Sequence, residues 1–214
     1  FFSSFDTGSH LTIIIFLLIG TIITCIVQSS AAVMAITIML CSSGVLPIYL
    51  GIALVMGENI GTTATANLAA LGANSQARRA ALAHLVFNVI GVVWVMCLFY
   101  PFVDLVCSLV GYDPKSTSYT VQQLTVKLPV VLAAFHTCFN ITNTGVLIWF
   151  IPQIEKLVCK LIKNKNKEED EEFRLRYIGG TTIMKTPELS VLEAQKEIHS
   201  FGERIVRMFG MVRE

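Results

Sequence analysis

Residues 7–57 contain no aspartate, glutamate, lysine or arginine. This stretch is far longer than the roughly 20 apolar residues that a helix needs to cross a bilayer. The chain has 16 basic and 15 acidic residues, and most of them lie from residue 155 onward. The first part is therefore expected in lipid and the last part in water. This pattern excludes a soluble globular enzyme, and a net charge of +1 gives no reason to expect nucleic-acid binding.

Two apolar segments are interrupted by polar residues. Residues 11–27 form an apolar run about 25 Å long as a helix, and Gln28-Ser29-Ser30 separates it from residues 31–40, which would span only about 15 Å. This predicts a re-entrant hairpin or a broken helix, covered by protein or water. Residues 57–63 in the same way predict a second break, between the apolar runs 45–56 and 64–71.

Two longer uncharged stretches, residues 80–103 and 128–154, are predicted to be complete membrane spans, with residues 104–127 as a polar loop between them. Lysines crowd the chain just after the second span, so the positive-inside rule predicts a cytoplasmic C-terminus. Counting spans backward places Arg78 and Arg79 inside and the polar loop outside.

The expected domains are a transmembrane repeat over residues 1–155, a charged cytoplasmic linker over 156–185, and a helix over 186–214. Thr186 is a suitable cap and Pro187 a suitable first helical residue. Apolar residues recur every three or four positions in this helix, so one face needs further helices, a second chain or the membrane surface. The sequence opens without methionine, and we expect either a processed chain or, in preference, a piece of a longer protein.

The polar interruptions are the candidate binding sites. Free backbone N–H groups at the start of a half-helix attract anions, while unwound carbonyls and side-chain oxygens can hold sodium. A repeated H-x-x-F-N pattern places His84 with Asn88, and His136 with Asn140, on one helical face. These residues either hydrogen-bond between helices or handle ions or protons.

Several motifs carry a family resemblance. Q-S-S-A at 28–31, G-E-N-I-G-T-T at 57–63 and A-R-R-A-A-L-A-H-L-x-F-N at 77–88 together resemble the second repeat of bacterial sodium/phosphate cotransporters related to the animal type II family. T-P-E-L at 186–189 resembles the start of the PhoU-type helical domain that many bacterial members carry.

The resemblance implies one half of an all-α inverted-repeat transporter in the bacterial inner membrane, performing sodium-coupled symport of inorganic phosphate. Sodium and phosphate would bind between the halves, at Gln28, Ser29, Ser30, Asn59, Thr62 and Thr63, with Gly57 and Gly61 permitting a tight backbone. The partners implied are these ions, the lipid bilayer, and the missing first repeat or a second copy in a homodimer. No cofactor is expected, and the only metal is sodium, held by the same residues.

Two residues depart from the family pattern. Ala31 stands where many members have a third serine, and Glu58 stands where a small residue is common. A carboxylate in hydrocarbon costs about 2.5–3.5 kcal/mol on insertion scales. Glu58 either holds sodium or titrates during transport, or it is simply solvated near the cytoplasmic mouth.

Other functions fit the sequence less well. A phosphate-sensing membrane protein without transport, or a sodium-coupled carrier of another oxyanion such as sulfate, remains open. An enzyme is not expected, because Ser29 and His84 lack a G-x-S-x-G motif or a nearby acidic residue to orient the histidine. The six cysteines show no C-x-x-C pair and are interpreted as small apolar residues rather than metal ligands or disulfides.

Overall fold

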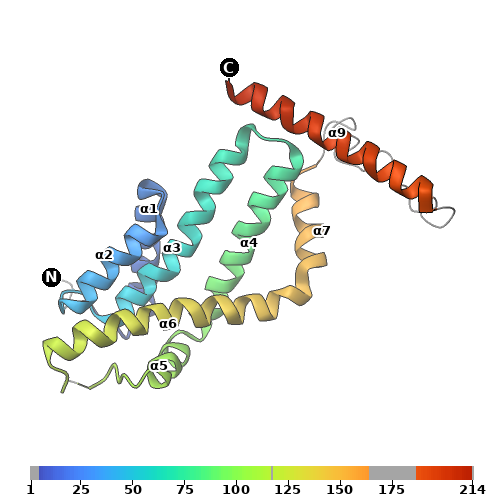
Figure 1. Cartoon of the computed structure of the whole chain (residues 1–214). Helices are drawn as coiled ribbons and strands as arrows, with labels where there is room; N and C mark the ends of the chain where they lie inside the picture. The colour runs from blue at the N-terminus through green and yellow to red at the C-terminus, as the bar shows by residue number, and fades with distance from the viewer. Residues whose placement is uncertain (1–4, 117, 164–186, 214) are drawn as a thin grey trace. The chain divides into compact units, whose positions relative to one another are not determined.

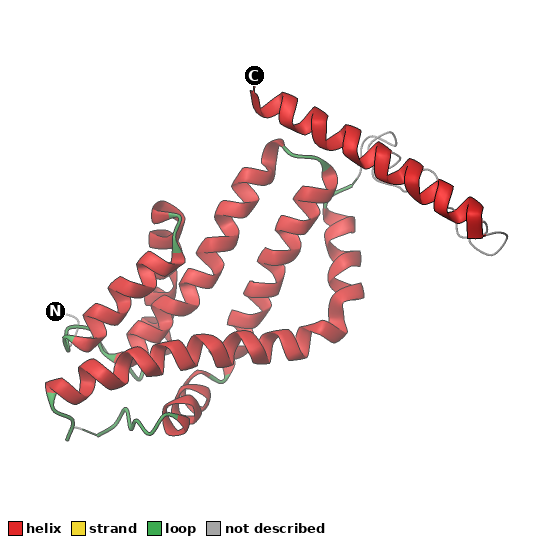
Figure 2. Cartoon of the chain, viewed as in Figure 1, coloured by secondary structure: helices red, strands yellow, loops and turns green. Residues whose placement is uncertain are grey.

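The computed structural model describes residues 5–116, 118–163 and 187–213, with side chains in the last segment described from 191 to 211. All regular elements in these residues are helices, which confirms the all-α membrane class (Figures 1 and 2). Residues 1–163 and 164–214 form two compact units, and each is described by itself. The elements of the first unit are α1 (His10–Val27), α2 (Ser30–Ser42), α3 (Ile48–Ala69), η2 (Ala70–Gly72), α4 (Ser75–Cys97), α5 (Phe99–Leu109), α6 (Val121–Leu147), η3 (Ile148–Phe150) and α7 (Ile151–Leu161).

The predicted break at residues 28–30 is confirmed. Helix α1 ends where Gln28 adopts the left-handed conformation, with φ 56°, and its N–H donates to Thr24 O at 2.8 Å. Ser29 is extended and caps α2 by accepting from the Ala32 N–H at 3.3 Å. The chain reverses direction over these two residues, so α1 and α2 form a helical hairpin.

The second predicted break, at residues 57–63, is wrong, because α3 runs unbroken from Ile48 to Ala69. The polar side chains of this segment bond back to their own helix: Thr62 Oγ1 donates to Glu58 O at 2.9 Å and Thr63 Oγ1 to Ile60 O at 2.7 Å. Such side-chain bonds to the preceding turn let hydroxyl residues remain inside an apolar helix. Polar residues within an apolar segment are therefore not sufficient evidence of a helix break.

Gly57 and Gly61 permit close packing of helices instead of a tight turn. A Cβ at Gly57 would lie 2.7 Å from Thr21 N and closer still to the Leu17 carbonyl oxygen, and one at Gly61 would lie 2.7 Å from Thr21 O. Gly20 faces the backbone of Leu54 in the same way. Helices α1 and α3 therefore run parallel with their backbones in contact, and α2 lies antiparallel to α3.

The predicted span 80–103 is divided in the structure. Helix α4 ends at Cys97, the chain bends at Leu98, and residues 99–103 begin α5. The polar loop predicted at 104–127 is much shorter than expected, because its first residues lie in α5 and its last in α6. Thr120 and Gln123 form a reciprocal capping box, which starts α6 at Val121 instead of at the first long apolar run.

The predicted span 128–154 is also divided. Helix α6 gives way to η3 at Ile148, and α7 starts at Ile151 with Pro152 in its first turn. Figure 1 shows α7 turning away from α6 to run beside α4. The Arg79 Nε donates to Ile162 O at 3.0 Å, so the start of α4 and the end of α7 share one end of the unit. The side of the membrane on which this end lies stays a prediction.

Three helical stretches among the described residues are long and apolar enough to cross a membrane: His10–Val27, Ser75–Cys97 and Val121–Leu161. Helix α3 is not one of them. It also differs from them in burial, since its residues 51–58 are all buried. A helix buried on every side for two turns is surrounded by protein. Helices α1, α2, α4 and α6 pack against it.

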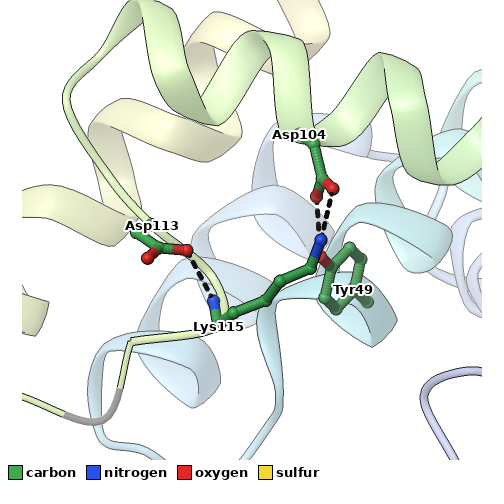
Figure 3. Close-up of polar contacts among 4 residues, drawn as sticks. All are labelled: Tyr49, Asp104, Asp113 and Lys115. Carbon is green, nitrogen blue, oxygen red and sulfur yellow. Dashed lines mark hydrogen bonds and ion pairs between the residues drawn. The ribbon is translucent and has the colours of Figure 1, made fainter.

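A cluster of polar contacts connects α5 and the α5–α6 loop to the start of α3 (Figure 3). Tyr49 on α3 donates its hydroxyl to Asp104 Oδ1 at 2.7 Å, and Lys115 Nζ lies 2.9 Å from Asp104 Oδ2. The Lys115 N–H donates to Asp113 Oδ1 at 2.9 Å. Burial raises the pKa of Asp104, but its bonds to Lys115 and Tyr49 outweigh this, and the net pKa lies below its ordinary value.

The second unit contributes α9 (Pro187–Arg213), which begins at the expected proline. Its predicted apolar face includes Val191, Ile198, Phe201 and Met208, and these side chains are exposed. The predicted cap Thr186, the side chain of Val212, and all but the first eight residues of the predicted charged linker lie outside the described residues.

We expect Gly57→Ala to destabilise the protein by about 1–3 kcal/mol, because the added methyl meets α1 backbone that cannot move aside. Gly145→Ala in α6 is the matched control, since a Cβ there meets nothing within 4 Å and alanine is the better helix former. Thermal unfolding of the full-length protein in detergent measures both. Equal unfolding temperatures for the two variants would contradict the packing role of Gly57.

We expect Asp104→Asn to lower the unfolding temperature by about 1–4 °C at neutral pH. Because the folded pKa of Asp104 is lowered, its stabilisation is present above the ordinary value of 3.8 and is lost as pH falls through the folded value. The variant and the wild type should therefore converge in acid. A difference that persists unchanged at low pH would rule out the charged pair as its cause.

Candidate functional site

The hairpin tip is the first part of the candidate site. The side chains of Gln28 and Ser30 are exposed, and that of Ser29 is half-buried. The left-handed Gln28 and the extended Ser29 direct the start of α2 toward this tip. A helix start of this kind offers backbone N–H groups and a partial positive charge to an anion.

The middle of α3 is the second part. Thr62 is exposed, Asn59 is half-buried, and Glu58 and Thr63 are buried. Glu58 is only 2% exposed, which contradicts the alternative that it is solvated at the cytoplasmic mouth. Its Oε1 lies within hydrogen-bonding distance of Thr37 Oγ1, at 3.3 Å.

The packing of the hairpin brings these two parts of the chain together. Cys25 in α1, three residues before the tip, contacts Gly61 O at 3.6 Å, and Thr37 in α2 contacts Glu58. Thr21 Oγ1 lies 3.1 Å from Gly57 O. Both arms of the hairpin therefore lie along the 57–63 segment. The segment is adjacent to the hairpin although it is not itself broken.

The H-x-x-F-N repeats behave differently from each other. Asn88 and Asn140 each donate to the carbonyl of the histidine four residues earlier, at 3.1 and 2.8 Å, rather than to a neighbouring helix. His136 does reach across: its Nε2 lies 3.3 Å from Asn59 Oδ1, which requires the proton on Nε2. His84 is exposed. Of these four residues, His136 is the one with a hydrogen bond to a candidate residue on α3 in the described part of the chain.

Sequence reasoning missed two polar residues that hold these elements in place. Asn143 in α6 is fully buried, donates to Phe87 O at 3.2 Å and accepts from Trp94 Nε1 at 3.2 Å, which joins α6 to α4. Thr37 is buried beside Glu58. A single amide or hydroxyl in an apolar helix was the available signal, because such groups must find partners inside the protein.

The candidate site therefore combines backbone donors, hydroxyls and amides at one hairpin with a buried carboxyl and a histidine behind it. These groups could bind a small oxyanion and a hard cation without covalent chemistry. Among residues 5–116, 118–163 and 187–213 no cluster of three or more His, Cys, Asp or Glu side chains is placed to hold a metal. The assignment of ion binding to the individual residues stays a prediction.

Comparison with known proteins finds a family that matches the first part of the chain. Residues 9–110 match the family described as Na+/Pi-cotransporter. The "Putative inorganic phosphate export protein YjbB" of Escherichia coli is 27% identical over 191 residues, covering 89% of this chain and 32% of the relative. The "Uncharacterized protein YqeW" of Bacillus subtilis is 30% identical over 149 residues, covering 70% of this chain and 44% of the relative.

A human relative is similar over a shorter region. "Sodium-dependent phosphate transport protein 2B" is 40% identical over 89 residues, 40% of this chain and 12% of that protein. The chain thus spans less than half the length of these three relatives. No solved structure gives a significant match. The match over residues 9–110, which include the hairpin and all of α3, shows that this part of the chain is similar to the Na+/Pi-cotransporter family.

Proposed function

We propose that this chain is part of a membrane transporter that moves inorganic phosphate and couples that movement to sodium. The observation that carries the proposal is the helix reversal at Gln28 and Ser29, which follows directly on the contact of Cys25 with the polar middle of α3. Irregular backbone at membrane depth persists where it lines a cavity or is buried in protein. The match of residues 9–110 to the Na+/Pi-cotransporter family supports phosphate as the anion and sodium as the cation.

In this proposal the start of α2 and the side chains of Gln28, Ser29, Ser30 and Thr62 contact the ions. Asn59 and His136 hold the middle of α3 against α6 through their hydrogen bond. A site made of neutral donors and acceptors favours binding of an ion pair over either ion alone, because the two charges offset each other. Sodium would then increase the affinity for phosphate.

The direction of net transport is a separate matter. One relative is named for phosphate export and another for sodium-dependent transport. The same binding site can work in either direction, since the gradients decide the net flux. The proposal therefore concerns coupling of the two ions and the residues that bind them. The first repeat or a second copy of the chain would supply the other half of the site.

We expect Ser29→Ala/Ser30→Ala to reduce sodium-dependent phosphate uptake by about tenfold or more, because two hydroxyls facing the ions are lost. The measurement is uptake by the full-length protein in lipid vesicles, with and without a sodium gradient. Ser42→Ala/Ser43→Ala is the matched control, since it changes two adjacent serines at the other end of the same helix. Wild-type uptake that ignores sodium would reject the coupling, and phosphate binding without uptake would favour a sensor.

We expect sulfate to compete with phosphate to a degree that depends on pH. Phosphate changes charge near neutral pH and sulfate does not, so a site selective for one phosphate form will lose affinity as that form declines. Inhibition of labelled phosphate uptake by sulfate, measured across the neutral range, reports this selectivity. Sulfate uptake that equals phosphate uptake at every pH would point to a general oxyanion carrier.

A further inference from the structure

Glu58 is a buried carboxyl that has no role in the ion binding proposed above. It lies in the middle of α3 and is 2% exposed. It is also the only acidic residue between positions 7 and 103. Burial of a charged carboxylate in such a place is energetically unfavourable unless a cation or a proton neutralises it.

The hydrogen bonds around Thr37 indicate which of these is present. Thr37 Oγ1 lies 2.9 Å from Val33 O and 3.3 Å from Glu58 Oε1. A hydroxyl carries one proton, and the shorter contact, to a carbonyl that can only accept, takes it. The longer contact between two oxygens then requires a proton on Glu58.

No basic side chain within the described residues forms an ion pair with Glu58. The titratable groups on the elements packed against α3 are Cys25 and His10 of α1, Cys41 of α2, Arg78, Arg79, His84 and Cys97 of α4, and Lys127, His136 and Cys138 of α6. Arg79 binds the carbonyl of Ile162, Lys127 that of Gly111, and His136 binds Asn59. Arg79, Lys127 and His136 thus form hydrogen bonds with groups other than Glu58.

We propose that Glu58 carries a proton in the conformation seen here, sealed between α2 and α3, and that release of this proton accompanies the transport cycle. The coupling half of this inference rests on the proposed transport function. It makes the protein sensitive to protons as well as to sodium.

The proton step is simple. When α2 and α3 separate enough for water to reach the carboxyl, the O–H bond of Glu58 breaks and water accepts the proton, leaving a carboxylate. The carboxylate must regain a proton from water before the two helices can close again, because an isolated buried charge opposes closure. Closure therefore follows reprotonation, and alkaline conditions favour the open form.

The protonated carboxyl can be detected without any transport. Infrared difference spectra of the purified full-length protein should contain the C=O stretch of a buried carboxylic acid at neutral pH. Glu58→Gln keeps the volume and should remove that band, whereas Thr37→Val should keep the band and shift its frequency. A spectrum in which Glu58→Gln removes no such band would overturn the protonated assignment.

The coupling is tested by phosphate uptake in vesicles between about pH 6 and about pH 8 with a fixed sodium gradient. Phosphate itself titrates in this range, so the comparison is between variants. We expect the ratio of uptake rates at the two pH values to differ from wild type by about threefold or more in Glu58→Gln. Glu155→Gln, the same change at an exposed carboxyl on α7, should keep the wild-type ratio.

The two proposals fail in different ways. If wild type and Glu58→Gln both transport with one shared pH profile, the coupling role of Glu58 is wrong and the phosphate transporter stands. If wild-type uptake ignores sodium at every pH, the proposed function fails, and the coupling fails with it. The infrared band still decides whether Glu58 holds its proton.

Discussion

Burial of α3 is the constraint on which the rest of the membrane unit depends. This helix carries a carboxyl, an amide and two threonine hydroxyls within six residues, in a unit otherwise made of apolar helices. It can exist there only because other helices surround it. Gly20, Gly57 and Gly61 let the α1 backbone touch that of α3, and α2 and α6 cover other sides. A side chain at any of these glycines would separate the helices and expose polar groups to lipid.

The same packing produces the candidate site. Since α1 and α3 are parallel and joined through α2, the chain must reverse twice, and the first reversal is the hairpin tip at Gln28 and Ser29. The contacts of Thr37 with Glu58 and of Cys25 with Gly61 place both arms of the hairpin beside the segment of α3 that carries Thr62. A movement of α2 relative to α3 would therefore change the proposed ion-binding groups and the environment of Glu58 together.

The contribution of α6 extends the site beyond the matched family region. That match ends at residue 110, whereas His136 and Asn143 lie on α6. His136 fixes the amide of Asn59, and Asn143 joins α6 to α4 through Phe87 O and Trp94. Buried polar contacts of this kind set the register of apolar helices, which otherwise have few directional interactions in a membrane.

The sequence by itself determined the membrane class, the helix ends marked by polar residues at Gln28 to Ser30, and the amphipathic helix starting at Pro187, because charge and apolar periodicity act locally. It also singled out Glu58. The sequence could not distinguish the true break at Gln28 from the false one at Gly57, since both segments are rich in polar residues. Only in the second segment do the polar side chains bond to the carbonyls of their own unbroken helix. Whether Gly57 turns the chain or admits a neighbouring backbone, and which of two similar histidines meets Asn59, was decided by tertiary packing. Those outcomes depend on contacts between residues far apart in the chain, which local pattern does not contain.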